Sequence, residues 1–272
     1  MQQFSASPRE LIASFWRNRE LTLTLIRRDV LGRYRGSALG ILWSFFHPLF
    51  MLAVYTFVFS VVFKARWGGG SGSKAEFALV LFAGLIVFNL FAECINRSPD
   101  LVLRNANYVK RVVFPLEILP WVAIGSALFH SVISLVVWLV FYAVLFGLPK
   151  VTILLLPGVI LPTILFIAGL CWFFAALGVY LRDISQVTTI LVTVTMFLSP
   201  IFYPSSALPA NLKPLLFLNP LTPTLEQFRG VLLWGKVPDP KLWLVYLAIS
   251  ALMAWLGFAW FQKVRRGFAD VI

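Results

Sequence analysis

The segment that decides the fold is FALVLFAGLIVFNLFAECIN, residues 77–96. Its 20 residues carry a single charged side chain, Glu93. At a rise of about 1.5 Å per residue, a helix of this length crosses roughly 30 Å of hydrocarbon. The segment therefore predicts a transmembrane helix.

Similar apolar runs lie on both sides of it, and the whole chain is 60% hydrophobic and only 12% charged. Soluble domains average about 45–50% hydrophobic residues and about 25% charged residues. A lipid bilayer can accept the excess apolar surface, whereas a soluble fold could not bury it. We therefore expect an all-α membrane protein with about six transmembrane helices, at residues 39–63, 77–96, 116–146, 152–181, 187–203 and 242–261.

The residues before the first span predict a helix on the membrane surface. Ser7 is placed as its N-cap, Pro8 at the first helical position, and Glu10 as the partner in a capping box. Apolar and basic side chains then recur at helical spacing, which is typical of an interfacial helix. The expected organisation is an amphipathic cytoplasmic region over residues 1–38, a permease domain over 39–262 and a cytoplasmic tail over 263–272.

Residues 204–241 differ from the spans because seven prolines interrupt them. Two apolar stretches remain, Leu212–Leu218 and Leu225–Trp234, and each is too short to cross a bilayer. We expect them to form short re-entrant helices between the fifth and sixth spans.

The distribution of Lys and Arg predicts the orientation. With both termini inside, 15 of the 23 basic residues fall in inner segments and 8 in outer ones. Because cytoplasmic loops carry the excess of positive charge, we expect both termini in the cytoplasm. The first apolar run begins near residue 38, too late and too long for a cleavable signal peptide.

Several function classes do not fit. The net charge of +12 is accounted for by orientation, so no nucleic-acid partner is expected. The glycine-rich residues 64–74 lack the Gly-Lys-Ser/Thr ending of a phosphate loop, so ATP hydrolysis is not expected on this chain. Two histidines and two cysteines give neither a metal site nor a catalytic set. Glu93 and Glu117 are expected near the cytoplasmic ends of their spans, and the absence of a carboxylate near the midplane weakens an ion-coupled carrier.

Two further features each allow two interpretations. Aromatic side chains that are dense in the first span and at the end of the fifth could line a sugar path, or face lipid and neighbouring helices. Gly32, Gly36 and Gly40 could allow close helix packing, or only loosen the junction before the first span. The candidate path residues are Trp43, Tyr55, Phe197 and Tyr203.

Five motifs, in order, resemble type-2 ABC exporter permeases that move polysaccharides, most of all the O-antigen lipopolysaccharide exporters. They are Arg33–Trp43 with Pro48, Asn107–Pro115 ahead of Glu117–Pro120, Leu181–Asp183, Asn219–Pro223 with Glu226 and Arg229, and Phe268–Asp270. The resemblance covers essentially the whole chain.

The resemblance implies a homodimer in the bacterial inner membrane, served by two copies of a cytoplasmic ABC ATPase that binds ATP and Mg²⁺. The implied substrate is polyprenyl-diphosphate-linked O-antigen polysaccharide. Capsule, teichoic-acid and drug or lipid exporters are alternatives, as is a membrane enzyme of polyprenyl-linked glycan assembly. The implied roles are ATPase coupling for Arg104, Asn107, Tyr108, Lys110 and Arg111; interface helix for Glu10, Phe15, Trp16 and Arg17; and outer gate for Asn219, Pro220, Glu226 and Arg229.

Overall fold

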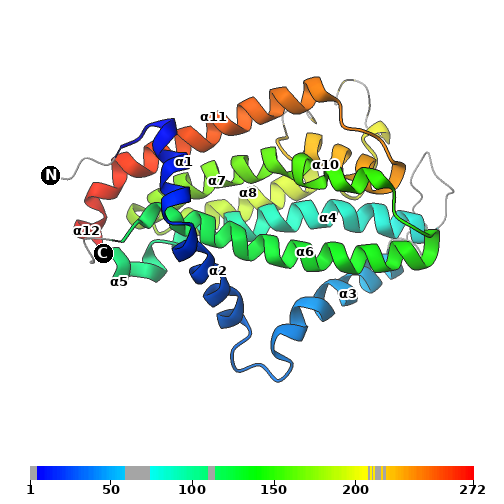
Figure 1. Cartoon of the computed structure of the whole chain (residues 1–272), viewed down its shortest axis with the longest axis horizontal. Helices are drawn as coiled ribbons and strands as arrows, with labels where there is room; N and C mark the ends of the chain where they lie inside the picture. Colours follow the sequence, from blue (N-terminus) through cyan, green and yellow to red (C-terminus); the bar gives the residue numbers. More distant parts are fainter. Residues whose placement is uncertain are drawn as a thin grey trace.

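The structure, a computed structural model, describes residues 5–58, 74–109, 114–207, 209, 211, 216 and 219–272. Within these ranges the chain is helical and contains no β-strand (Figure 1). The helices are α1 (Pro8–Arg17), α2 (Arg19–Arg33), α3 (Trp43–Tyr55), α4 (Lys74–Arg97), α5 (Ala106–Val109), α6 (Leu119–Phe146), α7 (Leu156–Tyr180), α8 (Ile184–Leu198), α10 (Thr222–Arg229), α11 (Pro240–Val264) and α12 (Phe268–Val271).

The predicted all-α class with about six spans is confirmed. Five helical segments are long and apolar enough to cross a membrane, and α8 is a shorter apolar helix of 15 residues. The fifth span was expected to reach residue 203, but α8 ends at Leu198. Pro200 explains the early end, because the residue before a proline is disfavoured in the helical conformation. The five long segments are Gly40–Val58, Ala75–Asp100, Leu116–Phe146, Val151–Tyr180 and Pro240–Val271, and the predicted end of the first span lies outside the described residues.

The central helix is α4, the one whose sequence decides the fold. In its most apolar window 83% of the residues are buried inside the protein, against 17–33% for the other four long segments. Helices α6, α7, α8 and α10 all pack on it. The buried indole of Trp138 on α6 donates a hydrogen bond to the carbonyl oxygen of Leu79 on α4 at 2.8 Å.

Helices α7 and α11 form the most extensive helix pair and lie side by side (Figure 1). A Cβ atom at Gly169 would collide with the backbone of Met253, and one at Gly257 would collide with the backbone of Gly169. Small residues thus bring two spans into backbone contact, as is common in membrane bundles.

The glycines that the sequence offered for close helix packing, Gly32, Gly36 and Gly40, lie at the end of α2 and in the turn that follows it. Among the described residues, a Cβ atom at Gly32, Gly36 or Gly40 would meet nothing within 4 Å. Gly36 and Gly40 have φ angles of +84° and +53°, in the left-handed region that favours glycine. They shape the turn between α2 and α3 and are not at a helix contact in the described part of the chain.

The N-terminal helices cross one end of the bundle, which also carries α5 and α12 (Figure 1). We call it the α1 end, and the opposite end, where α6 connects to α7, the far end. Helices α2 and α3 diverge from the bundle and form a V (Figure 1). Ser7 caps α1 as predicted, accepting a hydrogen bond from the amide of Glu10 at 3.2 Å. The capping box is not completed, because the Glu10 carboxylate pairs with Arg17 at 2.7 Å.

A short helix lies between α8 and α11 in the sequence. Helix α10 continues without a break into a π-helical turn, Gly230–Trp234. This 222–234 segment contains the predicted short helix 225–234 and begins earlier because Pro223 occupies its first turn. The other predicted short helix, Leu212–Leu218, lies mostly outside the described residues.

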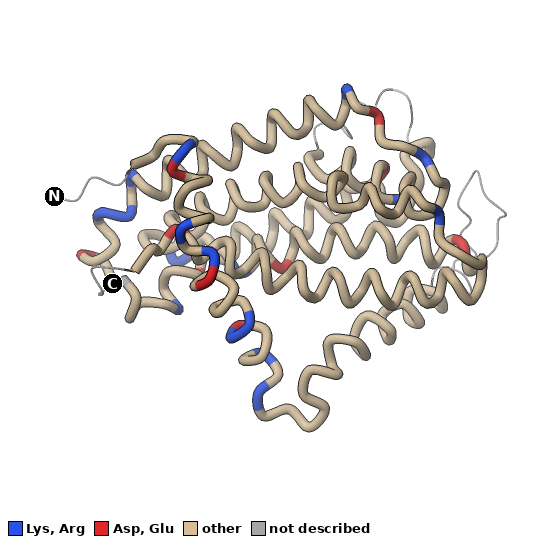
Figure 2. Tube along the Cα trace, in the orientation of Figure 1, with Lys and Arg blue, Asp and Glu red and all other residues tan. Residues whose placement is uncertain are grey.

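Lys and Arg are unevenly distributed over the bundle. Figure 2 shows most of the described ones at the α1 end and along α2, with fewer at the far end. The charge bias found in the sequence is therefore also a bias between the two ends of the structure.

Candidate functional site

A stripe of polar side chains runs along the central helix α4. Asn89, Glu93 and Asn96 recur at i, i+4 and i+7, so they share one face. Both asparagines are exposed, although most of α4 is buried. Polar and ionisable groups inside membrane spans are costly and normally mark a pathway or a binding site. The same spacing could have revealed this stripe in the sequence.

Glu93 makes its closest contacts with α2 and α6. Its carboxylate accepts a hydrogen bond from Arg33 of α2 and lies 3.3 Å from Nδ1 of His130 on α6. His130 is 14 residues into the segment Leu116–Phe146, about 20 Å along the helix from its start. Glu93 lies four residues before the end of α4, near the end of its span as expected, and it contacts α6 partway along that longer helix.

These groups belong to a chain of alternating charges. Arg97 contacts both carboxylate oxygens of Asp29 at 2.8 Å, and its other nitrogen lies 3.5 Å from Glu93. Nδ1 of His130 also lies 3.2 Å from Arg33. This nitrogen serves one partner at a time: it donates to Glu93 when protonated and accepts from Arg33 when it is not. The network links α2 to two spans, α4 and α6. Its two arginines are balanced by two carboxylates.

The network borders a cavity of about 480 Å³, which we call the polar cavity. Helices α3, α4 and α6 and the end of α2 form its walls. It is rich in amide, hydroxyl and imidazole groups and also contains one indole and one phenol ring. The lining residues are Arg33, Tyr34, Trp43, Ser44, His47, Pro48, Ile86, Asn89, Ala92, Glu93, Asn96, His130, Ser131 and Ser134.

A second, larger cavity of about 1030 Å³ lies between α3 and the halves of α4 and α6 nearer the far end. We call it the apolar groove, because its walls are almost entirely hydrocarbon. It is lined by Leu39, Trp43, Phe46, His47, Leu49, Phe50, Leu52, Ala53, Thr56, Phe57, Ala75, Ala78, Leu79, Phe141 and Leu145.

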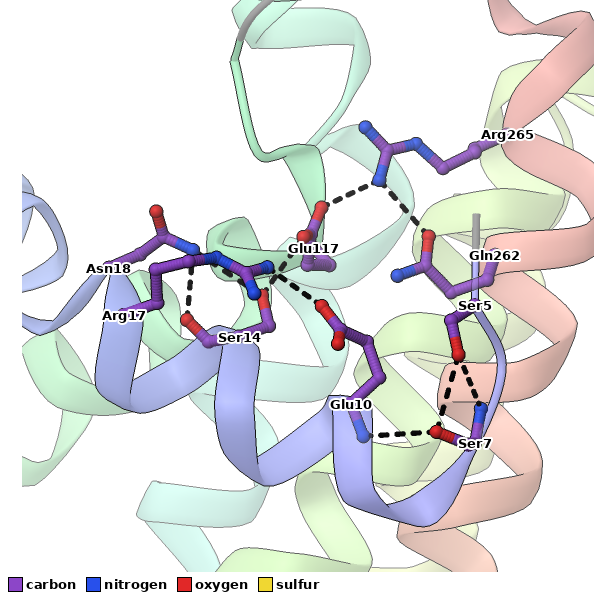
Figure 3. Close-up of polar contacts among 9 residues, drawn as sticks. All are labelled: Ser5, Ser7, Glu10, Ser14, Arg17, Asn18, Glu117, Gln262 and Arg265. Carbon is purple, nitrogen blue, oxygen red and sulfur yellow. Dashed lines mark hydrogen bonds and ion pairs between the residues drawn. The ribbon is translucent and has the colours of Figure 1, made fainter. Parts of the chain in front are cut away.

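A second polar cluster ties α1 to the bundle (Figure 3). The carboxylate of Glu117, at the start of the α6 segment, accepts hydrogen bonds from Ser14 of α1 at 2.9 Å and from Arg265 at 2.6 Å. Arg265 also donates to Gln262 at 3.0 Å. Three parts of the chain thus meet at one buried carboxylate.

The predicted interface-helix residues lie on α1. Arg17 pairs with Glu10, and this hydrogen bond raises the pKa of Arg17. The ring of Phe15 packs on Trp121 of α6, with ring centroids 5.2 Å apart. Trp16 is 60% exposed. Phe15 therefore anchors α1, while Trp16 and Arg17 remain accessible.

The described coupling residues, Arg104, Asn107 and Tyr108, lie at the α1 end, between α4 and α6. Arg104 is exposed and pairs with Asp100 at 3.0 Å, and Asn107 is also exposed. Tyr108 stacks on Phe114 with ring centroids 4.1 Å apart. Lys110 and Arg111 lie outside the described residues. The described part of this loop is packed on one side and accessible on the other.

The four candidate path aromatics are not brought together. Trp43 lines both cavities, whereas Tyr55, Phe197 and Tyr203 line neither. Phe197 is 61% exposed on α8, and the Tyr203 hydroxyl donates to its carbonyl oxygen at 3.3 Å. A single path for all four stays a prediction.

The predicted outer-gate residues connect α10 to the ends of other helices. Asn219 is buried and donates to Ser199 at 2.8 Å, while Pro220 and Glu226 are half-buried. Arg229 is fully buried and donates hydrogen bonds to three backbone carbonyls, those of Val80, Pro200 and Ile201. Arg229 therefore fixes α10 against α4 and the end of α8.

The chemistry of these sites is that of binding and positioning. Among the described residues, no group of three or more His, Cys, Asp or Glu side chains could hold a metal ion. Cys94 and Cys171 are buried free thiols in the core, as expected for packing residues. The described part of the chain is thus a multispanning helical bundle with a polar cavity among its helices and charged helices tied across one end.

The sequence matches the family described as "ABC-2 type transporter" over residues 20–233, and the chain belongs to this family. It is thus the transport subunit of such a system. A similar protein is the "O-antigen export system permease protein RfbA" of Myxococcus xanthus, 26% identical over 96% of this chain and 99% of the relative. A Klebsiella pneumoniae protein of the same name is 23% identical over 93% of this chain and 95% of the relative. The "Polysialic acid transport protein KpsM" of Escherichia coli is 25% identical over 88% and 91%.

Proposed function

We propose that this chain is the transmembrane subunit of an exporter that moves polyprenyl-diphosphate-linked O-antigen polysaccharide across the bacterial inner membrane. The observation that carries this proposal is the similarity, over nearly the whole chain, to two permeases named for O-antigen export. The polar cavity inside the bundle is consistent with a hydrophilic cargo.

ATP hydrolysis takes place on a separate cytoplasmic ABC ATPase, two copies of which serve a homodimer of this chain. ATP and Mg²⁺ bind that partner, and this chain needs no cofactor. Support comes from the α1 end, where the accessible Trp16, Arg17 and Arg104 offer a docking surface. The concentration of Lys and Arg at this end supports a cytoplasmic location for it and for both termini (Figure 2).

Gene deletion in the organism that encodes the chain tests the cargo. We expect O-antigen to disappear from the cell surface while lipid-linked O-antigen accumulates inside. Expression of the wild-type chain should restore export, and expression with a Walker-lysine variant of the ATPase should not. Normal surface O-antigen in the deletion strain would contradict the proposal.

A second candidate cargo is a capsular polysaccharide, favoured by the similarity to a polysialic acid transport protein. The same deletion separates the two cargoes. Loss of capsule with intact O-antigen would favour the second candidate.

A further inference from the structure

The polar cavity and the apolar groove adjoin each other. Trp43 and His47, one turn apart on α3, line both. Along α4 the polar cavity occupies residues 86–96 and the apolar groove residues 75–79. The combined space therefore has a polar part toward the α1 end and an apolar part toward the far end.

The polar part presents groups that hydrogen-bond and are not all used by the protein. Nε2 of His130 is buried and has no hydrogen-bond partner among the described residues. Asn89 and Asn96 are exposed, and their amides both donate and accept. Amides facing hydrocarbon would each cost free energy, so this surface is suited to water or a polar ligand.

The charges that line the polar cavity restrict the kind of ligand that it can bind. Arg33 is compensated by Glu93, so the cavity does not carry a large excess of positive charge. Donors and acceptors in near balance, beside the rings of Trp43 and Tyr34, fit a hydroxyl-rich sugar. The 38% exposed side chain of Arg33 keeps donors available for a linked phosphate.

The apolar part fits a hydrocarbon chain. Its walls carry aliphatic and aromatic side chains from α3, α4 and α6, and they continue to Ala75 and Leu145 near the far end. If the α1 end is cytoplasmic, a lipid of the inner leaflet has the same orientation as the combined space. Its polar head lies toward the α1 end, and its hydrocarbon chain extends toward the far end.

We propose that the two cavities together bind one isoprenoid lipid carrying a phosphate-linked sugar, with the sugar in the polar cavity and the hydrocarbon chain in the apolar groove. The proposal rests on the proposed function and locates its substrate within a single protomer. The site lies between α3, α4 and α6 of the same chain.

Photocrosslinking tests the site directly. The full-length permease, purified with its ATPase, is incubated with an isoprenyl diphosphate N-acetylhexosamine that bears a diazirine on its chain, and labelled peptides are mapped. We expect labels within residues 39–57 and 141–145. The unlabelled probe should compete for them, whereas phosphatidylglycerol and a sugar-free isoprenyl phosphate should compete less.

Two neighbouring positions on α3 provide matched variants. Ala53 lines the apolar groove, whereas Val54 is 37% exposed and does not. Ala53→Trp should lower labelling about tenfold, equivalent to about 1.4 kcal/mol, and Val54→Trp should leave it unchanged. If Ala53→Trp fails to fold, the wild-type labelling map decides.

Three results would overturn the proposal. Labels spread evenly over exposed apolar positions and competed by phosphatidylglycerol would mean ordinary bilayer lipid. Crosslinks from the groove to a second copy that exclude the probe would mean a subunit interface. An unlabelled groove in a permease that still exports O-antigen in cells would refute the site and leave the proposed function intact.

Discussion

The guanidinium of Arg265, at the end of α11, lies 2.6 Å from the carboxylate of Glu117, at the start of the α6 segment. Both side chains are only 8% exposed. Ser14 of α1 donates to the same carboxylate, so this ion pair joins an N-terminal surface helix to two spans (Figure 3).

Removing one member of this pair should destabilise the protein strongly. Glu117→Gln leaves Arg265 buried without its countercharge, and breaking a buried pair costs about 3–5 kcal/mol. We expect a clear fall in the thermal unfolding temperature of the purified protein. The double variant Glu117→Leu with Arg265→Met, which removes both charges, should regain part of the lost unfolding temperature. An unchanged unfolding temperature for Glu117→Gln would show that the pair contributes little.

Close packing of α7 on α11 gives a second prediction. Gly169→Ala places a methyl group against the backbone of Met253 and should cost about 1–3 kcal/mol. Gly158, on the same helix, has no atom of the described residues within 4 Å of its added Cβ atom. Gly158→Ala should therefore be neutral or stabilising by about 0.4–1 kcal/mol. Equal effects of the two variants on unfolding would contradict this packing.

Arg229 gives a third prediction, on the segment that contains α10. Its three backbone acceptors come from two regions, and a lysine ammonium cannot reproduce the planar geometry that reaches them. Arg229→Lys should leave at least one buried carbonyl without a donor, at about 1–3 kcal/mol, and should lower export. Arg182→Lys, at an exposed arginine with no proposed role, serves as the control. Wild-type export and stability of Arg229→Lys would rule out this role.

The loop between α4 and α6 gives a fourth prediction, about coupling to the ATPase. Arg104→Glu together with Lys110→Glu should leave membrane insertion intact, because it does not alter the apolar spans. It should release the ATPase or uncouple hydrolysis from export, since two cations of the proposed coupling loop are replaced by carboxylates. Co-purification and export assays measure this. A double variant that binds its ATPase and exports normally would contradict the coupling role. The cations of the loop would then only set orientation or bind anionic headgroups, at about 1 kcal/mol for each cation.

Much of the fold followed from apolar run length. The observed segments Leu116–Phe146 and Val151–Tyr180 agree with the expected 116–146 and 152–181 almost to the residue. Run length is informative because the hydrocarbon thickness sets it. The end of α8 was misplaced because apolar residues continue beyond Pro200, and hydropathy does not register a helix stop.

The candidate site was harder to predict, because it depends on how helices face one another. Glu93 and His130 are 37 residues apart on different helices, and only the packing of α4 on α6 joins them. Arg229 was expected in the short helix Leu225–Trp234 and, by resemblance, at the outer gate, but its complete burial was not predicted. Its burial depends on three carbonyls from other segments, which no local pattern reveals.

Reconstitution tests the central claim most directly. The permease is placed in proteoliposomes with its ATPase, and lipid-linked O-antigen in the leaflet facing the ATPase is followed into the opposite leaflet. We expect ATP-dependent translocation that requires both subunits and stops with a Walker-lysine variant of the ATPase. Translocation without ATP, or no translocation by an assembled and ATP-hydrolysing complex, would contradict the account.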